Sequence, residues 1–243
     1  MIKENFCLVG IDNDFVDFIK RNSSLFVGYF SNKDRYYKSV NKKKRLGDHI
    51  YKKWIIIKKK SNPVAIITID DGKVRETLIK KVFKKNCKNL ILKKAYVSKT
   101  TLKKIEKKKG ILIQDFTKIM SNVKIGDGTK IHIGAHVHHD NTIGKFVTIA
   151  PKAVLLGNVK IGDYSYIGAN STIICNNIIG EYAFIGAGAV VTKDVPDYAL
   201  LVGNPGKIIG WVNKKGERLK FNELGVSDCG QYEIINGKCN DIE

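Results

Sequence analysis

A six-residue repeat fills the second half of the chain and constrains its fold more than any other feature. From residue 111 to residue 194 the sequence divides into fourteen blocks of six without an insertion, and the third residue of every block is a branched aliphatic. These residues are Ile113, Ile119, Ile125, Ile131, Val137, Ile143, Ile149, Leu155, Ile161, Ile167, Ile173, Ile179, Ile185 and Val191. Because chance does not place fourteen aliphatic residues in phase, the pattern predicts one structural unit stacked many times.

A period of six has a direct structural meaning. A short strand followed by a sharp corner turns one aliphatic side chain inward per block, and three blocks close one triangular coil. The fourteen blocks then give about four and two-thirds coils. Glycine follows the aliphatic residue in several blocks, as at Gly126, Gly144 and Gly162. We expect these glycines to serve the corners, where the backbone angles disfavour a side chain.

The first half of the chain is predicted to be an α/β domain. Apolar runs indicate strands over 5–10, 25–30, 54–57, 64–69 and 89–92, and helical spacing marks 14–20 and 71–85. Strands alternating with helices favour a small, mostly parallel sheet. Ligands of such sheets bind beyond the carboxyl ends of the strands.

Charge divides the chain in the same place. Residues 1–110 hold 30 basic against 10 acidic residues, whereas residues 111–243 hold 13 of each. We therefore expect a Rossmann-like nucleotide-sugar-binding domain over 1–110, a β-helix over 111–212 and a polar tail over 213–243. The lysine runs of the first part carry no nucleic-acid-binding motif, so nucleic acid is not expected as a partner.

The remaining composition is that of an ordinary globular protein. Five cysteines at wide spacings argue for reduced thiols. No apolar run reaches the roughly 18–20 residues of a membrane span, and residues 1–5 lack a basic-then-apolar signal. A cytoplasmic protein is the expectation.

The order of these parts resembles a known group of enzymes. A small α/β domain followed by hexapeptide repeats is similar to the left-handed β-helix nucleotide-sugar acetyltransferases, close to the bacterial UDP-bacillosamine-pathway N-acetyltransferases and the sialic-acid O-acetyltransferase-like group. The resemblance is strongest over 133–144 and 157–162, extends to the exit segment 194–205, and is looser over 65–71 with Arg75. It implies a left-handed parallel β-helix, a homotrimer, acetyl-CoA as co-substrate and no metal.

In that family a histidine followed by an acidic residue is the general base pair, which implies His139 and Asp140 here. Acetyl transfer needs a base that is neutral near pH 7, and a carboxylate can orient an imidazole. His139 and Gly157 are 18 residues apart, one coil, so Gly157 should lie beside His139. A bare glycine leaves room for a thioester, and its N–H could stabilise the oxyanion. His138 is the second choice for the base.

The histidine cluster also permits duller interpretations. Four of the five histidines lie within residues 132–139, and some β-helix proteins hold zinc between successive coils. No histidine follows residue 139, so the next coil cannot supply a further histidine ligand. Structural or surface histidines remain a second alternative.

The resemblance also assigns the binding positions. Contacts to CoA fall on Thr148, Gly157, Ala169, Ala187 and Lys207. Thr148 departs from the bacillosamine-type enzyme, which carries a second histidine there.

Substrate contacts fall on three turns of the first domain, at Gly10, Asn13, Ser31, Asn32, Lys33 and Asp70. The glycine-rich turn of the family is reduced to Gly10, and Asp70 replaces a glycine.

These features predict transfer of acetyl from acetyl-CoA to the amino group of a nucleotide-linked amino sugar, for surface glycan biosynthesis. O-acetylation of a sugar hydroxyl is the alternative, because one base serves both nucleophiles. A non-catalytic protein that binds nucleotide sugar or CoA is the other.

Overall fold

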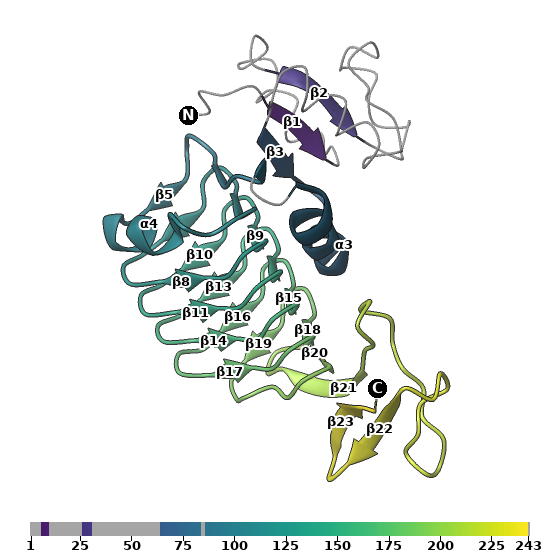
Figure 1. The fold of residues 1–243 in the computed structure, drawn as a ribbon. Helices are drawn as coiled ribbons and strands as arrows, with labels where there is room; N and C mark the ends of the chain where they lie inside the picture. The colour runs from purple at the N-terminus through teal and green to yellow at the C-terminus, as the bar shows by residue number, and fades with distance from the viewer. Residues whose placement is uncertain (1–5, 10–25, 31–63, 84–85, 243) are drawn as a thin grey trace. The chain divides into compact units, whose positions relative to one another are not determined.

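The chain is described by a computed structural model over residues 6–9, 26–30, 64–83 and 86–242. It divides into two compact units, Met1–Leu90 and Ile91–Glu243 (Figure 1). None of the helices in the described ranges is long and apolar enough to cross a membrane.

A parallel sheet forms one part of the first unit. Its strands are β1 (Phe6–Val9), β2 (Phe26–Phe30) and β3 (Val64–Ile67), in the order β2-β1-β3. Val9 pairs with Phe30 on one side and with Ile67 on the other, so the three carboxyl ends lie together. Three of the predicted strands are confirmed in this sheet. The predicted strand over 89–92 is also present, but it belongs to a sheet of the coils and not to the α/β sheet. The predicted strand over 54–57 and helix over 14–20 lie outside the described residues, and the Rossmann-like assignment of the whole domain stays a prediction.

The predicted helix after β3 is present, with an unusual second half. α3 (Gly72–Thr77) begins at Asp71, whose side chain accepts a hydrogen bond from the Val74 amide at 3.0 Å. It continues as the π-helical segment η4 (Leu78–Phe83), which buries Leu78, Ile79 and Phe83.

The second unit is a stack of triangular coils, drawn in teal and green in Figure 1. Each block contributes one two-residue strand that pairs in parallel with the strand 18 residues away, as Val137 does with Leu155. Three sheets result, in the orders β19-β16-β13-β10-β7-β5, β17-β14-β11-β8 and β21-β20-β18-β15-β12-β9-β6-β4. The strands of the repeat are β6 (Leu112–Ile113), β7 (Lys118–Ile119), β8 (Lys124–Ile125), β9 (Lys130–Ile131), β10 (His136–Val137), β11 (Thr142–Ile143), β12 (Thr148–Ile149), β13 (Val154–Leu155), β14 (Lys160–Ile161), β15 (Tyr166–Ile167), β16 (Thr172–Ile173), β17 (Ile178–Ile179), β18 (Phe184–Ile185) and β19 (Val190–Val191).

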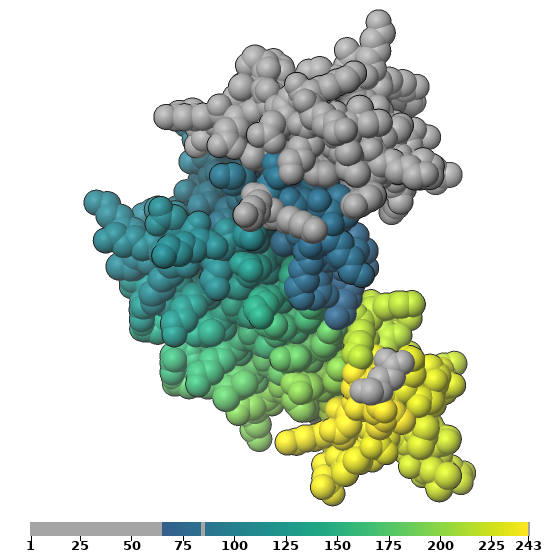
Figure 2. Space-filling view, viewed as in Figure 1, coloured from purple at the N-terminus to yellow at the C-terminus, as the bar shows by residue number. Residues whose placement is uncertain are grey.

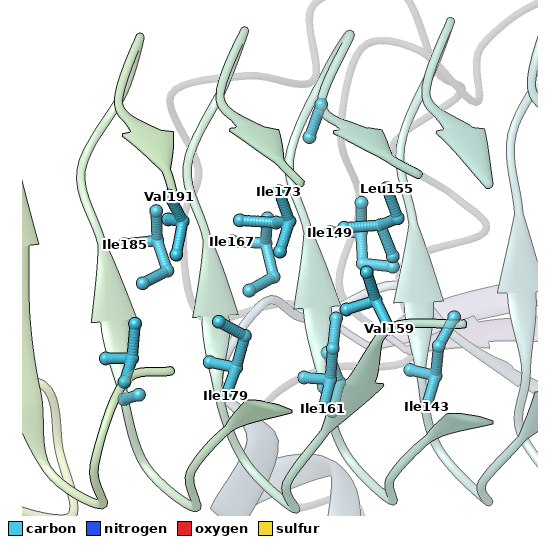
Figure 3. Close-up of a cluster of buried hydrophobic side chains, with 14 of the residues drawn as sticks. Ile143, Ile149, Leu155, Val159, Ile161, Ile167, Ile173, Ile179, Ile185 and Val191 are labelled. Atoms are coloured by element: carbon cyan, nitrogen blue, oxygen red, sulfur yellow. The ribbon is translucent and has the colours of Figure 1, made fainter. Parts of the chain in front are cut away.

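The aliphatic third residues form the core, as predicted. All fourteen are buried, with at most 4% of each exposed. Figure 3 shows part of this core, with Ile149, Ile167 and Ile185 following one another in one inward-facing ladder. Within each ladder, aliphatic side chains of successive coils pack against one another, so the hydrophobic core is continuous from coil to coil.

The corners correct one expectation about glycine. The left-handed backbone conformation belongs to the sixth residue in thirteen of the fourteen blocks, and Asn122, Asp140 and Asn158 there have φ between 57° and 63°. The glycines at the fourth position have no positive φ. A Cβ at Gly126 or Gly162 would lie 2.4–2.5 Å from backbone atoms of the next coil. Glycine at the fourth position is therefore required by close backbone packing between coils.

The coil stack begins before the repeat does. β4 (Leu90–Ile91) and β5 (Tyr96–Val97) join the sheets, and Tyr96 pairs with Lys118. α4 (Lys99–Ile105) follows, with the Ser98 side chain accepting from the Thr101 amide at 3.3 Å and with Ile105 buried in the core. In Figure 1, α4 lies at the end of the stack that holds β5.

An aromatic column and the C-terminal segment close the other end. Phe146, Tyr164, Tyr182 and Tyr198 stack along one corner, with ring centroids 4.8–5.2 Å apart. β20 (Ala199–Val202) and β21 (Lys207–Trp211) form an antiparallel pair after the last coil. The hairpin of β22 (Tyr232–Ile235) and β23 (Lys238–Asp241) follows.

The segment predicted to be a polar tail is thus folded onto the stack. Tyr232 packs edge-on against Tyr198 at 5.4 Å, and Tyr232 and Cys239 join the core of the coils. Figure 2 shows the yellow C-terminal residues packed against the green end of the stack.

The packed hairpin predicts a difference in reactivity between Cys239, which lies in β23, and Cys229, which precedes β22. Cys239 is buried, and burial raises the pKa of its thiol to about 11, whereas Cys229 is exposed. At pH 8 the thiolate fraction of Cys239 is about one in a thousand, and thiolate is the reactive species. We expect iodoacetamide to label Cys229 within minutes and to leave Cys239 unmodified until the protein unfolds. Peptide mass mapping measures this, and equal labelling of both would contradict the docked hairpin.

Candidate active site

The corner between β10 and β11 presents His139 and Asp140. β10 ends at Val137 and β11 begins at Thr142, so both residues lie in the intervening turn. Asp140 takes the left-handed conformation with φ 61°, which aspartate tolerates better than most residues. The turn is tied to the next coil, because the His139 carbonyl accepts a hydrogen bond from the Asn158 amide at 3.1 Å.

The two side chains form a hydrogen-bonded pair, as predicted from the sequence. His139 Nδ1 lies 2.8 Å from Asp140 Oδ2, and the side chains are 60% and 47% exposed. An ionised carboxylate only accepts hydrogen bonds, so in the neutral imidazole Nδ1 carries the proton and Nε2 has the lone pair. A neutral imidazole held this way can take a proton from a ligand.

Gly157 lies directly beside the imidazole. A Cβ at residue 157 would come 2.9 Å from His139 Cε1 and 3.0 Å from Nε2, closer than van der Waals contact. Among the described residues, no acceptor pairs with the Gly157 N–H. The spacing of 18 residues therefore produces the predicted neighbour, with an amide donor available next to the imidazole.

Asp140 has a further partner that the sequence analysis missed. Asn122 Nδ2 donates to Asp140 Oδ1, and this bond, followed by the bond to His139, holds the pKa of the Asp140 carboxyl below its usual range. Asn122 in turn accepts from Lys104 Nζ of α4. The 18-residue spacing between Asn122 and Asp140 was a usable signal for the first contact. The Lys104 contact had none, because α4 lies outside the repeat.

The other histidines of the cluster do not join this pair. His136 is exposed on β10, and His132 and His138 are partly buried. Within the described part of the chain, no group of three or more histidine, cysteine, aspartate or glutamate side chains could hold a metal ion.

Of the predicted CoA contacts, Gly157 lies beside His139, and the other four lie elsewhere on the chain. Ala169 and Ala187 are one coil apart at the corner between the sheet of β12 and the sheet of β10, whereas His139 and Gly157 are at the next corner. Thr148 lies in β12 and is only 4% exposed. Lys207 is exposed at the start of β21. Within one chain these positions do not converge on His139.

The predicted sugar-nucleotide contacts belong to the first unit. Asp70 is exposed just after β3, at the carboxyl end of the sheet. Gly10, Asn13, Ser31, Asn32 and Lys33 lie outside the described residues, where the chain continues from β1 and β2.

Arg75 braces the turn that carries Asp70. It is 1% exposed and donates to the carbonyl of Ile69 at 3.1 Å and to that of Asp70. Burial lowers the pKa of Arg75 to about 10, against the opposing effect of Asp70 and Asp71. Through these two hydrogen bonds, the buried guanidinium of Arg75 holds the backbone of the turn at Ile69 and Asp70 in place.

Sequence comparison identifies the repeats. Residues 122–157, 140–175 and 158–193 match the family described as bacterial transferase hexapeptide (six repeats). A 52-residue stretch is 46% identical to the dTDP-3-amino-3,6-dideoxy-α-D-galactopyranose 3-N-acetyltransferase of Aneurinibacillus thermoaerophilus. That stretch is 21% of this chain and spans 27% of the relative, about a quarter of its length.

Structural comparison extends over both units. A variant of the perosamine N-acetyltransferase of Caulobacter crescentus, solved with CoA and GDP-perosamine, matches with a TM-score of 0.73 at 22% identity. The match covers 86% of this chain and 98% of that one. The acetyltransferase domain of PglB from Neisseria gonorrhoeae, solved with acetyl coenzyme A, has a TM-score of 0.69 at 24% identity and covers 84% and 98%. These likenesses concern the fold. Residues 122–193 therefore match the bacterial transferase hexapeptide family, and the coils that they form build a left-handed parallel β-helix.

Proposed function

We propose that this protein transfers an acetyl group from acetyl-CoA to the amino group of a nucleotide-linked amino sugar. The observation that carries the proposal is the imidazole of His139, bonded through Nδ1 to Asp140 and lying over the bare Gly157. A general base, the carboxylate that orients it and a backbone amide donor are the groups that acyl transfer needs.

The reaction follows from these groups. The amine nitrogen attacks the thioester carbonyl carbon, and His139 Nε2 takes the proton that the nitrogen loses. The carbonyl oxygen becomes negative and accepts a hydrogen bond from the Gly157 N–H. The carbon–sulfur bond then breaks, the CoA thiolate leaves and receives a proton, and the sugar amide is the product. Asp140 stabilises the imidazolium while it exists.

The space at Gly157 suits the thioester. Any side chain there would meet the imidazole, so the glycine keeps open the position where the acetyl group must lie. The relatives support the same substrates, since the solved perosamine enzyme holds CoA and GDP-perosamine and the curated relative acts on a dTDP-linked amino sugar. Surface glycan synthesis and a cytoplasmic location are part of this proposal.

The proposal includes a homotrimer. His139 and Gly157 lie at one corner of the coil, and Ala169 and Ala187 at another. A groove between two copies, with one corner supplied by each, would put both sets against a single CoA molecule. We assign the nucleotide to the carboxyl end of the β2-β1-β3 sheet, near Asp70.

A direct assay tests the proposal. The full chain is incubated with acetyl-CoA and a panel of UDP-, dTDP- and GDP-linked amino sugars, and the products are analysed by mass spectrometry. We expect one amino sugar to gain the mass of an acetyl group, with stoichiometric release of free CoA thiol. The matched control is the same nucleotide sugar with a hydroxyl in place of the amine. Acetylation of the hydroxyl sugar alone would indicate O-acetyl transfer, and binding without turnover would indicate a non-catalytic protein.

A further inference from the structure

The pair of His139 and Asp140 is attached to a chain of hydrogen bonds that begins on α4. We propose that Lys104 and Asn122 form a positioning relay that fixes the tautomer of the His139 imidazole, with the proton on Nδ1 and the lone pair on Nε2. The catalytic meaning of the relay rests on the proposed function, whereas the tautomer itself does not.

The relay begins with a group that can only donate. Lys104 Nζ bonds the Asn122 carbonyl oxygen at 3.3 Å and also the side-chain Oδ1. An ammonium group has three donors and no acceptor, so the amide of Asn122 must turn its oxygen toward the lysine. Its Nδ2 is then directed away from α4.

In the second step, the side-chain NH₂ group of Asn122 faces the carboxylate of Asp140. Asn122 Nδ2 donates to Asp140 Oδ1, and Asp140 Oδ2 faces His139 Nδ1 at 2.8 Å. With one oxygen occupied by the amide and the other at the imidazole, the carboxylate has a defined orientation. The asparagine bond is also the largest of the causes that lower the pKa of Asp140, which favours the ionised carboxylate that accepts the Nδ1 hydrogen bond.

The relay rests on a rigid support. Asn122 has φ 63°, and its backbone N–H donates to Thr100 Oγ1 at 3.0 Å. Thr101 Oγ1 donates to the Met120 carbonyl at 2.8 Å, and Ile105 is buried in the core. These hydrogen bonds join α4 to the corner that carries Asn122. They keep Lys104 close to the side-chain amide of Asn122.

The repeat supplies a matched control. Asn176 occupies the equivalent corner position three coils further on, with φ 66°, and its Oδ1 accepts from Asn158 Nδ2 at 2.9 Å. Asn176 therefore resembles Asn122 in its place in the coil, in its backbone conformation and in bonding to a residue one coil away, but its side chain does not bond to Asp140. Asn122→Asp and Asn176→Asp are therefore comparable near-isosteric changes, and only the first removes the donor that faces the carboxylate.

The experiment measures the tautomer and the kinetics separately. ¹⁵N NMR of histidine-labelled full-length protein reports which ring nitrogen of His139 is protonated, and His139 is identified by the signals lost in His139→Ala. We expect wild type and Asn176→Asp to show the Nδ1–H form. In Asn122→Asp the new carboxylate at position 122 repels that of Asp140 and turns it away from Nδ1, so we expect a mixture of both forms. In Asn122→Asp we expect kcat to fall about tenfold with KM for acetyl-CoA within about twofold.

Lowering the pH provides a readout that a purely structural role would not change. Protonation of either carboxyl group restores a donor between residues 122 and 140, so the ratio of the Asn122→Asp rate to the wild-type rate should rise as the pH falls. Lys104→Met removes the donor that orients the side-chain amide of Asn122, so it should also give a mixture of His139 tautomers. Lys104→Arg keeps a donor and should keep the Nδ1–H form. Lys104→Met also serves as the test if Asn122→Asp does not fold.

A wild-type tautomer in both Asn122→Asp and Lys104→Met overturns the relay. A shifted tautomer in Asn122→Asp alone overturns the lysine step and supports the asparagine step. If wild type acetylates no amino-sugar nucleotide, the proposed function fails while the NMR comparison still decides the relay.

Discussion

His139→Ala should lower kcat by about 100- to 10,000-fold, the range that a positioned general base contributes. The imidazole is the group that Asp140 orients, and its Nε2 lies over Gly157. The side chain is 60% exposed, so its removal should leave the melting temperature nearly unchanged. Steady-state kinetics with the amino sugar identified in the panel, together with thermal unfolding, would measure both effects.

The neighbouring histidines supply the control for this result. His136 lies on β10 with its side chain exposed and makes no contact with Asp140, so His136→Ala should retain activity within about twofold. His138 precedes the pair and was the second choice from the sequence. A large loss in His138→Ala together with a near-normal rate in His139→Ala would contradict the assignment of the base.

Gly157→Ala should lower kcat by about 100-fold. The added methyl group would lie 2.9–3.0 Å from the ring atoms of His139, so the imidazole must move, and displacing a reacting group by about 1 Å costs a rate factor of this size. The methyl group also occupies the space assigned to the acetyl group. The variant keeps its backbone N–H, so the loss arises from crowding and not from a missing donor.

A double-mutant cycle separates crowding from other effects. In the wild-type background, Gly157→Ala should destabilise the fold by about 1 kcal/mol, the lower end of the cost of overpacking, because the exposed imidazole can shift away from the methyl group. In the His139→Ala background, the Cβ has free space and the cost should nearly vanish, which gives a coupling energy of the same size. Additive changes in the free energy of unfolding, measured by chemical denaturation, would show that the two residues are not in contact.

The site was predictable in part because the coil has a fixed period. Once three blocks make one coil, residues 18 apart are neighbours, so the contact of His139 with Gly157 follows from counting. The same count places Asn122 beside Asp140. The role of the fourth-position glycines could not be predicted from the period alone. The space that they need is set by backbone atoms of another coil, whose distance the sequence pattern does not give.

The sequence by itself determined the coil, its aliphatic ladders and the corner that carries the imidazole, because in a repeat each separation along the chain corresponds to one separation in space. Only the tertiary structure revealed that Lys104 reaches Asn122 from α4, that the C-terminal hairpin packs on Tyr198, and that Thr148 is buried. These contacts come from segments outside the repeat or from surfaces that other segments cover. Their geometry depends on how irregular elements pack, and no period in the sequence encodes that packing.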